Sequence, residues 1–561
     1  MLKNTPYLRI SALIFSAACA LPAICRAADE TEAQKTPDAV QKSEAPAAPA
    51  VPAATADDAQ KNLVENSVVK IFSQVRRPDL TKPWTKQSPH EITGSGVVIE
   101  GKRILTNAHV VSYASQVQVQ ASQSGDKLSA TVEAIAPGID LAVLKLEDES
   151  FFDTHPALPR TTTLPQVKDP VLVYGFPAGG TSLSITKGIV SRIEFAGYGF
   201  PVSGLRVQID AAINAGNSGG PALIGDKVIG LAFSHLTNAQ NIGYIIPSEE
   251  IDLFLKDVAD GQYDGKPAIF DDFQTLENPA LRAFLKLDKS VSGIVINEPF
   301  SDEASYPLKK WDVITKIGTT KVDDQGMVKV EGGLRLRLAY MVQKVAKNGK
   351  LPLTIVRAGV EKEIELPVTS RYSRVISALK GDYPSYFICG PMVFSVATED
   401  LIGVLTSSNQ AASLVSAFSM LGSPLINRRG SKLAFEGEQL VIVPAPFFPH
   451  KLSKGYSPQT MRVVESVNGI RVKNLLHLVE ILRDSKDEFI VIDFAERSGE
   501  TPIFPRAEMI AATDEILTDN GVRAQGSPDV LKVWEAKKPA PANAAEPKVP
   551  AVKKDSAPAK K

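Results

Sequence analysis

Short apolar runs separated by turn residues fill the chain from about residue 62 to residue 247. Among them are SATVEAIA, QVQVQA, DLAVLKLE, PVLVYGF, GIVSRIEF, LRVQIDA, KVIGLAFS and IGYIIP, and glycine punctuates the series. Many short strands at regular spacing indicate an all-β barrel or sandwich pair. The next segment, EEIDLFLKDVADG at 249–261, has helical apolar spacing and ends in a glycine, so a helix is predicted there.

Two modules of mixed α and β follow. In the first, strands are predicted at SGIVINE, DVITKIG and LPLTIVRAG, and LRLRLAYMVQKVAKNG predicts a helix that closes at Asn348. In the second, Asn468-Gly469 is a hairpin signal, VKNLLHLVEILRD predicts an amphipathic helix and EFIVIDF a strand. The order strand, turn, strand, helix, strand recurs at 311–357 and 461–494, which indicates a diverged duplication or two copies of one module.

The N-terminus has the pattern of an export signal. Lys3 and Arg9 precede an apolar run, and small residues near Ala27 fit a cleavage site, so residues 1–27 are predicted to be removed. No later segment offers about 20 apolar residues in a row, and no stable membrane insertion is expected after cleavage. Lipid attachment at Cys19 is the alternative. The predicted location is the periplasm or cell envelope.

Composition and net charge limit the partners and the kinds of segment that can be expected. The chain has 561 residues and a net charge of -1, which gives no reason to expect nucleic acid as a partner. Residues 28–60 are Ala, Pro and charge, and they predict a disordered linker. The basic, Lys/Ala/Pro-rich end at 536–561 predicts a solvated tail, with weak attraction to an acidic envelope surface as the alternative. Cys389 is the only cysteine beyond the signal, so no internal disulfide is expected.

The stretch AAINAGNSGGPALIG, residues 211–225, places Ser218 among glycines between two apolar runs. A serine nucleophile needs a base, and the base needs an acid to hold its tautomer. His109 in ILTNAHVV and Asp140 in PGIDLAVLKL stand at the ends of predicted strands, and the glycines let the amides of Gly216 and Ser218 converge as an oxyanion hole. Taken singly, each residue has a non-catalytic interpretation: the serine in a turn, the aspartate as a cap and the histidine as a polar loop residue. Their joint occurrence in the order His, Asp, Ser favours a catalytic triad.

The remaining histidines show no metal-like pairing and are interpreted as structural: His90, His155, His235, His450 and His477. For His235, which lies near the predicted substrate pocket, a role in that pocket is the alternative to a strand-end residue. The chain has no phosphate-binding loop of the GxxxxGK[ST] type either. No metal and no cofactor are expected.

The active-site wording resembles one family. TNAHVV, DLAVLKL and GNSGGPAL resemble the three active-site segments of the Deg/HtrA serine proteases, and GFPAGGTSLSITKGIVSR and NIGYIIPS resemble the plant-type Deg branch. The resemblance spans about 65–535. It implies a mainly β chain, in which a chymotrypsin-like double β-barrel precedes two α+β PDZ-like domains. It also implies ATP-independent cleavage of misfolded proteins and homotrimers or multiples of trimers, and it assigns His109, Asp140 and Ser218 as the triad.

These expectations together predict the domain organisation. The predicted parts are a signal peptide at 1–27, a linker at 28–60, a protease domain at 61–261, a PDZ domain at 262–370, a second, degenerate PDZ-like domain at 371–535 and a tail at 536–561.

Specificity is predicted from the residue six before the nucleophile. In trypsin-like enzymes that residue is an acid that holds Lys or Arg, and here it is Ala212. With Ala232, Phe233 and Ser234 as the far wall, we expect a small apolar pocket that prefers Val, Ala or Ile before the cut.

The first PDZ-like module departs from the family pattern. Where a glycine-containing loop would clamp a chain-terminal carboxylate, the chain reads Ala268-Ile269-Phe270-Asp271, and Asp271 with Asp272 is expected to repel a carboxylate. An oligomer spacer or a binder of internal segments is therefore favoured over C-terminus capture. The second module shows no clamp, and the resemblance to the plant-type Deg branch implies that it serves assembly.

The function predicted from these features is ATP-independent serine endopeptidase activity on misfolded or damaged proteins outside the cytoplasm, in quality control. Two alternatives stay open. One is a chaperone or scaffold that holds unfolded clients with little proteolysis, and the other is a processing protease with a single natural substrate.

Overall fold

The structure is a computed structural model that describes residues 63–536 except 179, 181, 200–201, 236–241, 371 and 408–410. The predicted export signal, the linker and the tail beyond Ala536 lie outside these residues. Among the described helices, none is long and apolar enough to cross a membrane.

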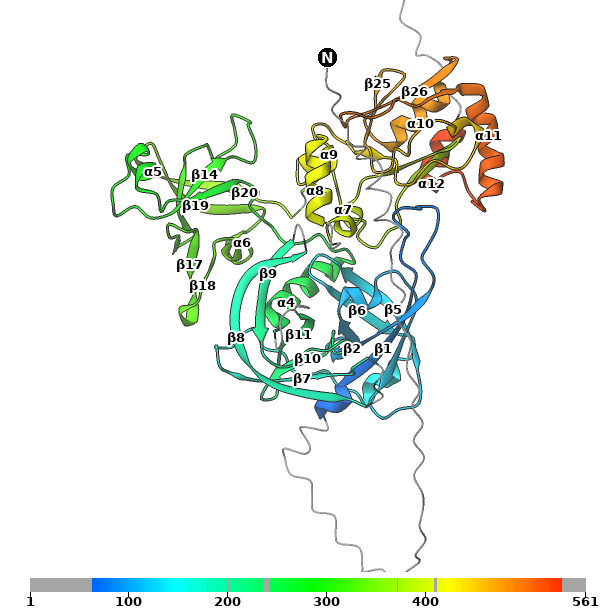
Figure 1. Ribbon diagram of the computed structural model, residues 1–561. Coiled ribbons are helices and arrows are strands. Elements are labelled where there is room, and N and C mark those ends of the chain that lie inside the picture. The colour runs from blue at the N-terminus through cyan, green and yellow to red at the C-terminus, as the bar shows by residue number, and fades with distance from the viewer. Residues whose placement is uncertain are drawn as a thin grey trace, which may run out of the picture. The chain divides into compact units, whose positions relative to one another are not determined.

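Twelve strands close into two antiparallel barrels of six strands each (Figure 1). The first barrel has the order β1-β2-β3-β6-β5-β4. Its strands are β1 Val68–Val75, β2 His90–Ile99, β3 Arg103–Thr106, β4 Ala114–Ala121, β5 Leu128–Ala136 and β6 Leu141–Leu146. Strand β4 shows the pattern that produces such strands. Val117 and Val119 are buried, whereas the glutamines at 116, 118 and 120 are more exposed, which is the period of a half-buried strand.

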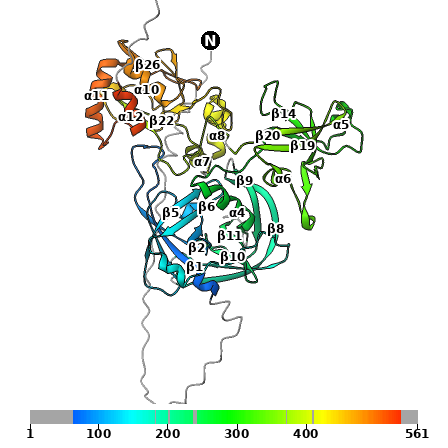
Figure 2. The same ribbon diagram turned by 180° about the vertical axis from the view of Figure 1, so that it is seen from behind.

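The second barrel has the order β10-β11-β12-β9-β8-β7. Its strands are β7 Pro170–Gly175, β8 Ser184–Gly199, β9 Val202–Ile209, β10 Pro221–Ile224, β11 Lys227–His235 and β12 Gly243–Pro247. Strands β8 and β9 curve together along one side of this barrel in both views (Figure 2). The prediction of an all-β barrel pair is confirmed.

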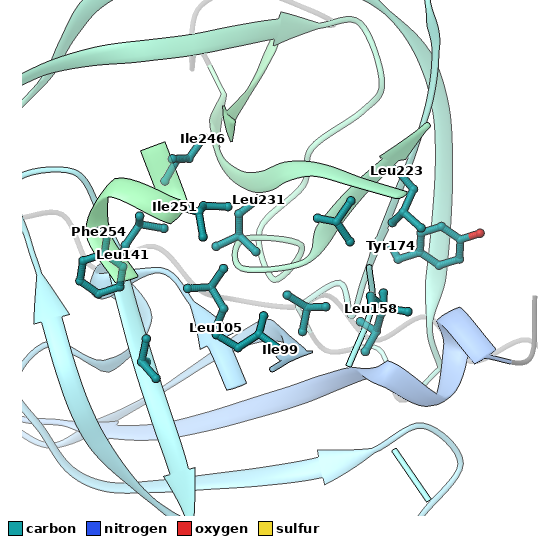
Figure 3. Packing of buried hydrophobic residues seen from close by; sticks show 14 of the residues in the cluster. Ile99, Leu105, Leu141, Leu158, Tyr174, Leu223, Leu231, Ile246, Ile251 and Phe254 are labelled. Atoms are coloured by element: carbon teal, nitrogen blue, oxygen red, sulfur yellow. The ribbon is translucent and has the colours of Figure 1, made fainter. Parts of the chain in front are cut away.

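One apolar cluster joins the two barrels (Figure 3). Ile99 and Leu105 come from the first barrel, Leu231 comes from the second, and Ile251 and Phe254 come from helix α4, Ser248–Asp257. A 3₁₀ turn at Val258–Asp260 continues α4 and ends at a left-handed glycine, so the helix predicted at 249–261 is confirmed with its cap. Because this core is shared, side chains carried by the two barrels hold fixed positions relative to each other.

The first mixed module is built on a sheet with the order β13-β14-β15-β19-β20. Its elements are β13 Asp272–Thr275, α5 Pro279–Phe284, β14 Ile294–Glu298, β15 Val313–Ile317, β16 Thr320–Lys321, β17 Met327–Lys329, β18 Arg335–Arg337, α6 Ala339–Val345, β19 Lys350–Arg357 and β20 Val360–Pro367. The helix predicted to begin at LRLRL is wrong in its first part. Strand β18 pairs with β17 there, because alternating Leu and Arg has the period of a strand. The helix ends at Val345 rather than at Asn348.

The second mixed module contains strands and helices in mixed order. Its elements are β21 Tyr386–Cys389, β22 Met392–Val396, α7 Glu399–Thr406, α8 Ala411–Met420, α9 Pro424–Asn427, β23 Val441–Ile442, β24 Val464–Val467, β25 Ile470–Arg471, α10 Leu475–Asp484, β26 Phe489–Phe494, β27 Ile503–Pro505, α11 Arg506–Asp519 and α12 Pro528–Glu535. Both residues of the predicted hairpin turn, Asn468 and Gly469, have positive φ, as a type I′ turn requires. The hairpin, the helix and the strand predicted here are confirmed.

The loop before β13 differs from its expected role. Asp271 is 5% exposed, and its carboxylate accepts hydrogen bonds from the Phe300 amide and the Tyr306 hydroxyl, both at 2.9 Å. Burial raises the pKa of Asp271. The expectation that Asp271 faces and repels an incoming carboxylate is therefore wrong, because its side chain is used inside the module. Asp272 is the exposed acid of this loop.

Candidate active site

His109 and Asp140 are in direct contact. His109 lies in the short helix α3, Ala108–Val111, which follows β3, and Asp140 ends the turn that leads into β6. The Asp140 Oδ2 atom is 2.7 Å from His109 Nδ1, and Oδ1 accepts a hydrogen bond from the His109 backbone amide at 2.8 Å. With Nδ1 donating to the carboxylate, the His109 Nε2 atom carries the free lone pair that a base needs.

A third residue holds the Asp140 backbone. Asn107 is fully buried, and its Nδ2 donates to the Asp140 carbonyl at 2.9 Å. Asp140 has a φ of 57°, in the left-handed region that aspartate adopts more readily than most residues. The main chain and the side chain of Asp140 are thus both tied to the segment that carries His109.

Ser218 is half-buried in the loop between β9 and β10. Gly94 on β2 shows how close this loop comes to the histidine segment. A methyl group added at Gly94 would lie 2.8 Å from the Val110 side chain and 3.4 Å from the Ser218 carbonyl oxygen. Among the described residues no hydrogen bond joins the Ser218 hydroxyl to His109. The structure therefore brings the histidine and the aspartate together and places Ser218 on a loop that approaches them.

The predicted oxyanion donors have an arrangement that suits their role. Gly216 has a φ of 97°, which requires glycine. The carbonyl of Ala215 accepts a hydrogen bond from the Ala178 amide at 2.7 Å, so the N–H of the same peptide, on Gly216, points the opposite way. Within the described part of the chain, the amides of Gly216 and Ser218 donate to no protein acceptor. Between residues 216 and 220 the other three amides form hydrogen bonds within the domain: Asn217, Gly219 and Gly220.

The residues predicted to line the substrate pocket have unlike surroundings. Ala212 is exposed, whereas Ala232 is fully buried. Ala232 supports the nucleophile loop through its backbone, because its carbonyl accepts from the Gly219 amide and its amide donates to the Gly220 carbonyl, at 2.8 and 2.9 Å. Phe233 is half-buried and stacks on Tyr198 at 5.1 Å. The side chain of Ser234 lies outside what the structure describes.

Three residues of the site were missed by the sequence reasoning: Ser95, Asn107 and Ala178. Asn107 and Ser95 stand inside the segments TNAHVV and GSGVV, but their hydrogen bonds reach residues far away in the sequence. The described residues hold no group of three His, Cys, Asp or Glu side chains that could bind a metal.

Comparison with known proteins agrees with this geometry. The trypsin-like peptidase domain family matches residues 94–231, and the PDZ domain family matches residues 376–529. Protease Do-like 2 of Arabidopsis thaliana, a chloroplastic protein, is 34% identical over 478 residues, which cover 84% of this chain and 76% of the relative. The chain belongs to the Deg/HtrA family of serine proteases. As a Deg/HtrA protein it is a serine endopeptidase.

A second relative and one solved structure are also similar to this chain. Protease Do-like 4 of Arabidopsis thaliana, a mitochondrial protein, is 34% identical over 464 residues, covering 80% of this chain and 85% of the relative. The solved structure of the HtrA-type protease AlgW with decapeptide has a TM-score of 0.43 and 24% identity, and covers 56% of this chain and 98% of that chain. The similarity of the Do-like proteases extends well past the trypsin-like domain into both following modules.

Proposed function

We propose that this protein degrades misfolded or damaged proteins without ATP, in a compartment outside the cytoplasm, with His109, Asp140 and Ser218 as its catalytic triad. The observation that carries the proposal is the pair of hydrogen bonds, 2.7 and 2.8 Å, by which one carboxylate holds both the ring and the backbone of His109. His109 is exposed, so its burial does not require this pairing, whereas a base must be held in one tautomer and one orientation.

The proposed mechanism uses only these groups. His109 Nε2 takes the proton of the Ser218 hydroxyl as its oxygen attacks the peptide carbonyl, and Asp140 stabilises the imidazolium that forms. The amides of Gly216 and Ser218 hold the oxyanion. His109 then protonates the leaving amine, and a water activated by the same ring hydrolyses the acyl-enzyme.

Cleavage after small apolar residues is part of the proposal. Ala212 stands where an acid would bind a basic side chain, and we assign Phe233, which is half-buried, to the far wall of the pocket. A peptide library should therefore show Val, Ala or Ile before the cut. A strong preference for Lys or Arg would contradict this specificity.

The compartment and the assembly are also proposed. The export pattern of residues 1–27 supports the periplasm or cell envelope, and the Do-like relatives are named as chloroplastic and mitochondrial proteins. We propose homotrimers or multiples of trimers, from the family resemblance. The domain bounds 61–261, 262–370 and 371–535 belong to the same proposal.

The test compares residues 28–561 with the Ser218→Ala variant, using reduced casein without ATP. Casein should disappear with the wild type and survive with the variant, because the nucleophile is absent. If casein is degraded equally by both proteins, the proposed nucleophile is wrong. If neither cleaves it and aggregation of an unfolded client is suppressed, the chaperone alternative replaces the protease proposal.

A further inference from the structure

Ser95 lies where the two barrels meet the nucleophile loop. It belongs to β2 of the first barrel and is fully buried. Its Oγ donates to the Gly216 carbonyl at 2.8 Å and accepts from the Phe176 amide at 2.8 Å. One hydroxyl thus donates a hydrogen bond to one segment of the second barrel and accepts one from another, 121 and 81 residues away in the sequence.

The backbone of Ser95 makes two more contacts with the site. Its amide donates to the Ser218 carbonyl at 2.8 Å, and its carbonyl accepts from the Thr106 hydroxyl at 2.7 Å. Thr106 is three residues before His109. Ser95 therefore contacts the proposed nucleophile, the proposed oxyanion donor and the segment that carries the base.

The contact with Gly216 matters because of that residue's conformation. A glycine at a φ of 97° has no side chain to restrict its rotation, so its neighbouring peptides must be held from outside. Ala178 holds the peptide before Gly216 through the Ala215 carbonyl, and Ser95 holds the peptide after it through the Gly216 carbonyl. The first bond holds the peptide that carries the Gly216 N–H. The second, together with the bond from the Asn217 amide to the Asn214 carbonyl at 3.0 Å, holds the peptide that follows it.

We propose that Ser95 is a positioning residue for the oxyanion hole, which orients the Gly216 amide from the other barrel. It touches neither the reacting atoms nor the substrate. The inference rests on the proposed function, since it assigns the Gly216 amide to the transition state. A donor held in place before reaction stabilises the oxyanion without reorganisation, so its loss should lower kcat more than it changes KM.

The chain offers a matched control in Ser73. It lies on β1 of the same barrel and is equally buried, but its hydroxyl has no hydrogen-bond partner among the described residues. Ser73→Ala and Ser95→Ala remove the same atom from the same kind of surroundings, and only Ser95→Ala removes hydrogen bonds to the nucleophile loop.

The experiment measures kcat and KM on a fluorogenic peptide, the affinity of a peptide boronate, and thermal unfolding. A boronate becomes tetrahedral when it bonds to the Ser218 oxygen, so it reports the oxyanion hole. For Ser95→Ala we expect kcat to fall about 10- to 100-fold with KM within about 3-fold, and boronate affinity to fall with kcat. Ser73→Ala should keep wild-type values. If Ser95→Ala does not fold, Ser95→Cys replaces it, because a thiol fills a similar space and forms weaker hydrogen bonds. Its kcat and boronate affinity should lie between the wild-type values and those expected for Ser95→Ala.

Two results would overturn the inference. One is a Ser95 variant that matches Ser73→Ala in kcat and in boronate affinity. The other is a loss of activity that follows only KM or the fraction of unfolded protein. In either case the wild type still cleaves through Ser218, so the proposed function survives. Absence of Ser218-dependent cleavage by the wild type would instead overturn both.

Discussion

At the scale of single residues, the site contains an aspartate, Asp140, whose backbone is in the left-handed conformation. Asp140 has a φ of 57°, and both of its carboxylate oxygens and its backbone carbonyl accept hydrogen bonds from the segment 107–109. The left-handed conformation is the means by which a residue at the mouth of a strand turns its side chain toward a neighbouring segment. Its modest cost is offset by the three hydrogen bonds that the turn allows.

Replacing Asp140 tests whether the carboxylate acts in catalysis. In Asp140→Asn an amide can present its N–H₂ to His109 Nδ1 and favour the wrong tautomer, so we expect kcat to fall by about 10³- to 10⁴-fold with little loss of folded protein. Steady-state kinetics and circular dichroism check both. The control is Asp153→Asn, which changes an exposed carboxylate of the same domain. This variant should keep the wild-type kcat and the wild-type fold. A loss below tenfold in Asp140→Asn would argue against the triad.

At the scale of elements, helix α10 shows how one polar residue starts a helix. Asn474 precedes the helix with an extended backbone, and its Oδ1 accepts from the His477 amide at 2.8 Å. Its Nδ2 donates to the Gly437 carbonyl at 2.9 Å, which also ties the helix start to an earlier loop. His477 therefore takes part in the cap through its backbone, in agreement with its reading as a structural residue.

The cap contributes measurable stability to the second mixed module. Asn474→Ala leaves the His477 amide without its acceptor and should lower the free energy of unfolding by about 1 kcal/mol, as measured by urea denaturation. Asn474→Asp keeps the acceptor and loses only the bond to Gly437, so it should be less destabilising. Equal destabilisation by both variants would mean that the loop contact, and not the cap, is the stabilising interaction.

At the scale of the whole molecule, the shared core of the two barrels holds the site together. Leu158 lies in the connection between the barrels, is 1% exposed and packs in the cluster shown in Figure 3. Its amide also donates to the Val98 carbonyl at 3.2 Å. Since His109 and Ser218 come from different barrels, any loosening of this packing would separate the proposed base from the proposed nucleophile.

Removing Leu158 packing should therefore reduce stability and activity together. Leu158→Ala is expected to lower the free energy of unfolding by about 2 to 5 kcal/mol, because it leaves a cavity in a fully packed core. Val167→Ala, in the same connection but 46% exposed, is the control and should change stability by less than about 0.5 kcal/mol. Chemical denaturation, followed by tryptophan fluorescence, gives the free energy of unfolding of both variants. Equal free energies of unfolding for Leu158→Ala and Val167→Ala would disprove the role of the shared core.

The chain holds together without a cross-link in the described region. Cys389 is a free thiol, 2% exposed, and burial raises its pKa to about 12. At pH 8 about one thiol in 10⁴ is then ionised, so iodoacetamide should not label native residues 28–561. In urea one thiol per chain should react, and dithiothreitol should leave the melting temperature unchanged. Rapid labelling of the native protein, measured by mass spectrometry, would show that the thiol is accessible.

Sequence patterns predicted much of the fold because those patterns are local. Alternating valines predicted strands such as β4, and Asn468-Gly469 predicted its turn, since each depends on neighbours in the chain. The same kind of reasoning failed at LRLRL, where a strand period stood directly before a helical one and the two were read as a single helix. Local periodicity cannot locate that boundary, because residue 338 fits both patterns.

For the site, the sequence by itself determined the residue types and their order: a histidine after β3, an aspartate before β6 and a serine among glycines. It could do so because the chemistry of a serine nucleophile demands those groups and the glycines that let amides converge. Only the tertiary structure decided how the groups are held. The bonds from Ser95 to Gly216, from Asn107 to Asp140 and from Ala178 to Ala215 join segments that are distant in sequence. The Asn107 bond forms when the first barrel closes and the Ala178 bond when the second closes, and the Ser95 bond forms only when the two barrels pack on their common core.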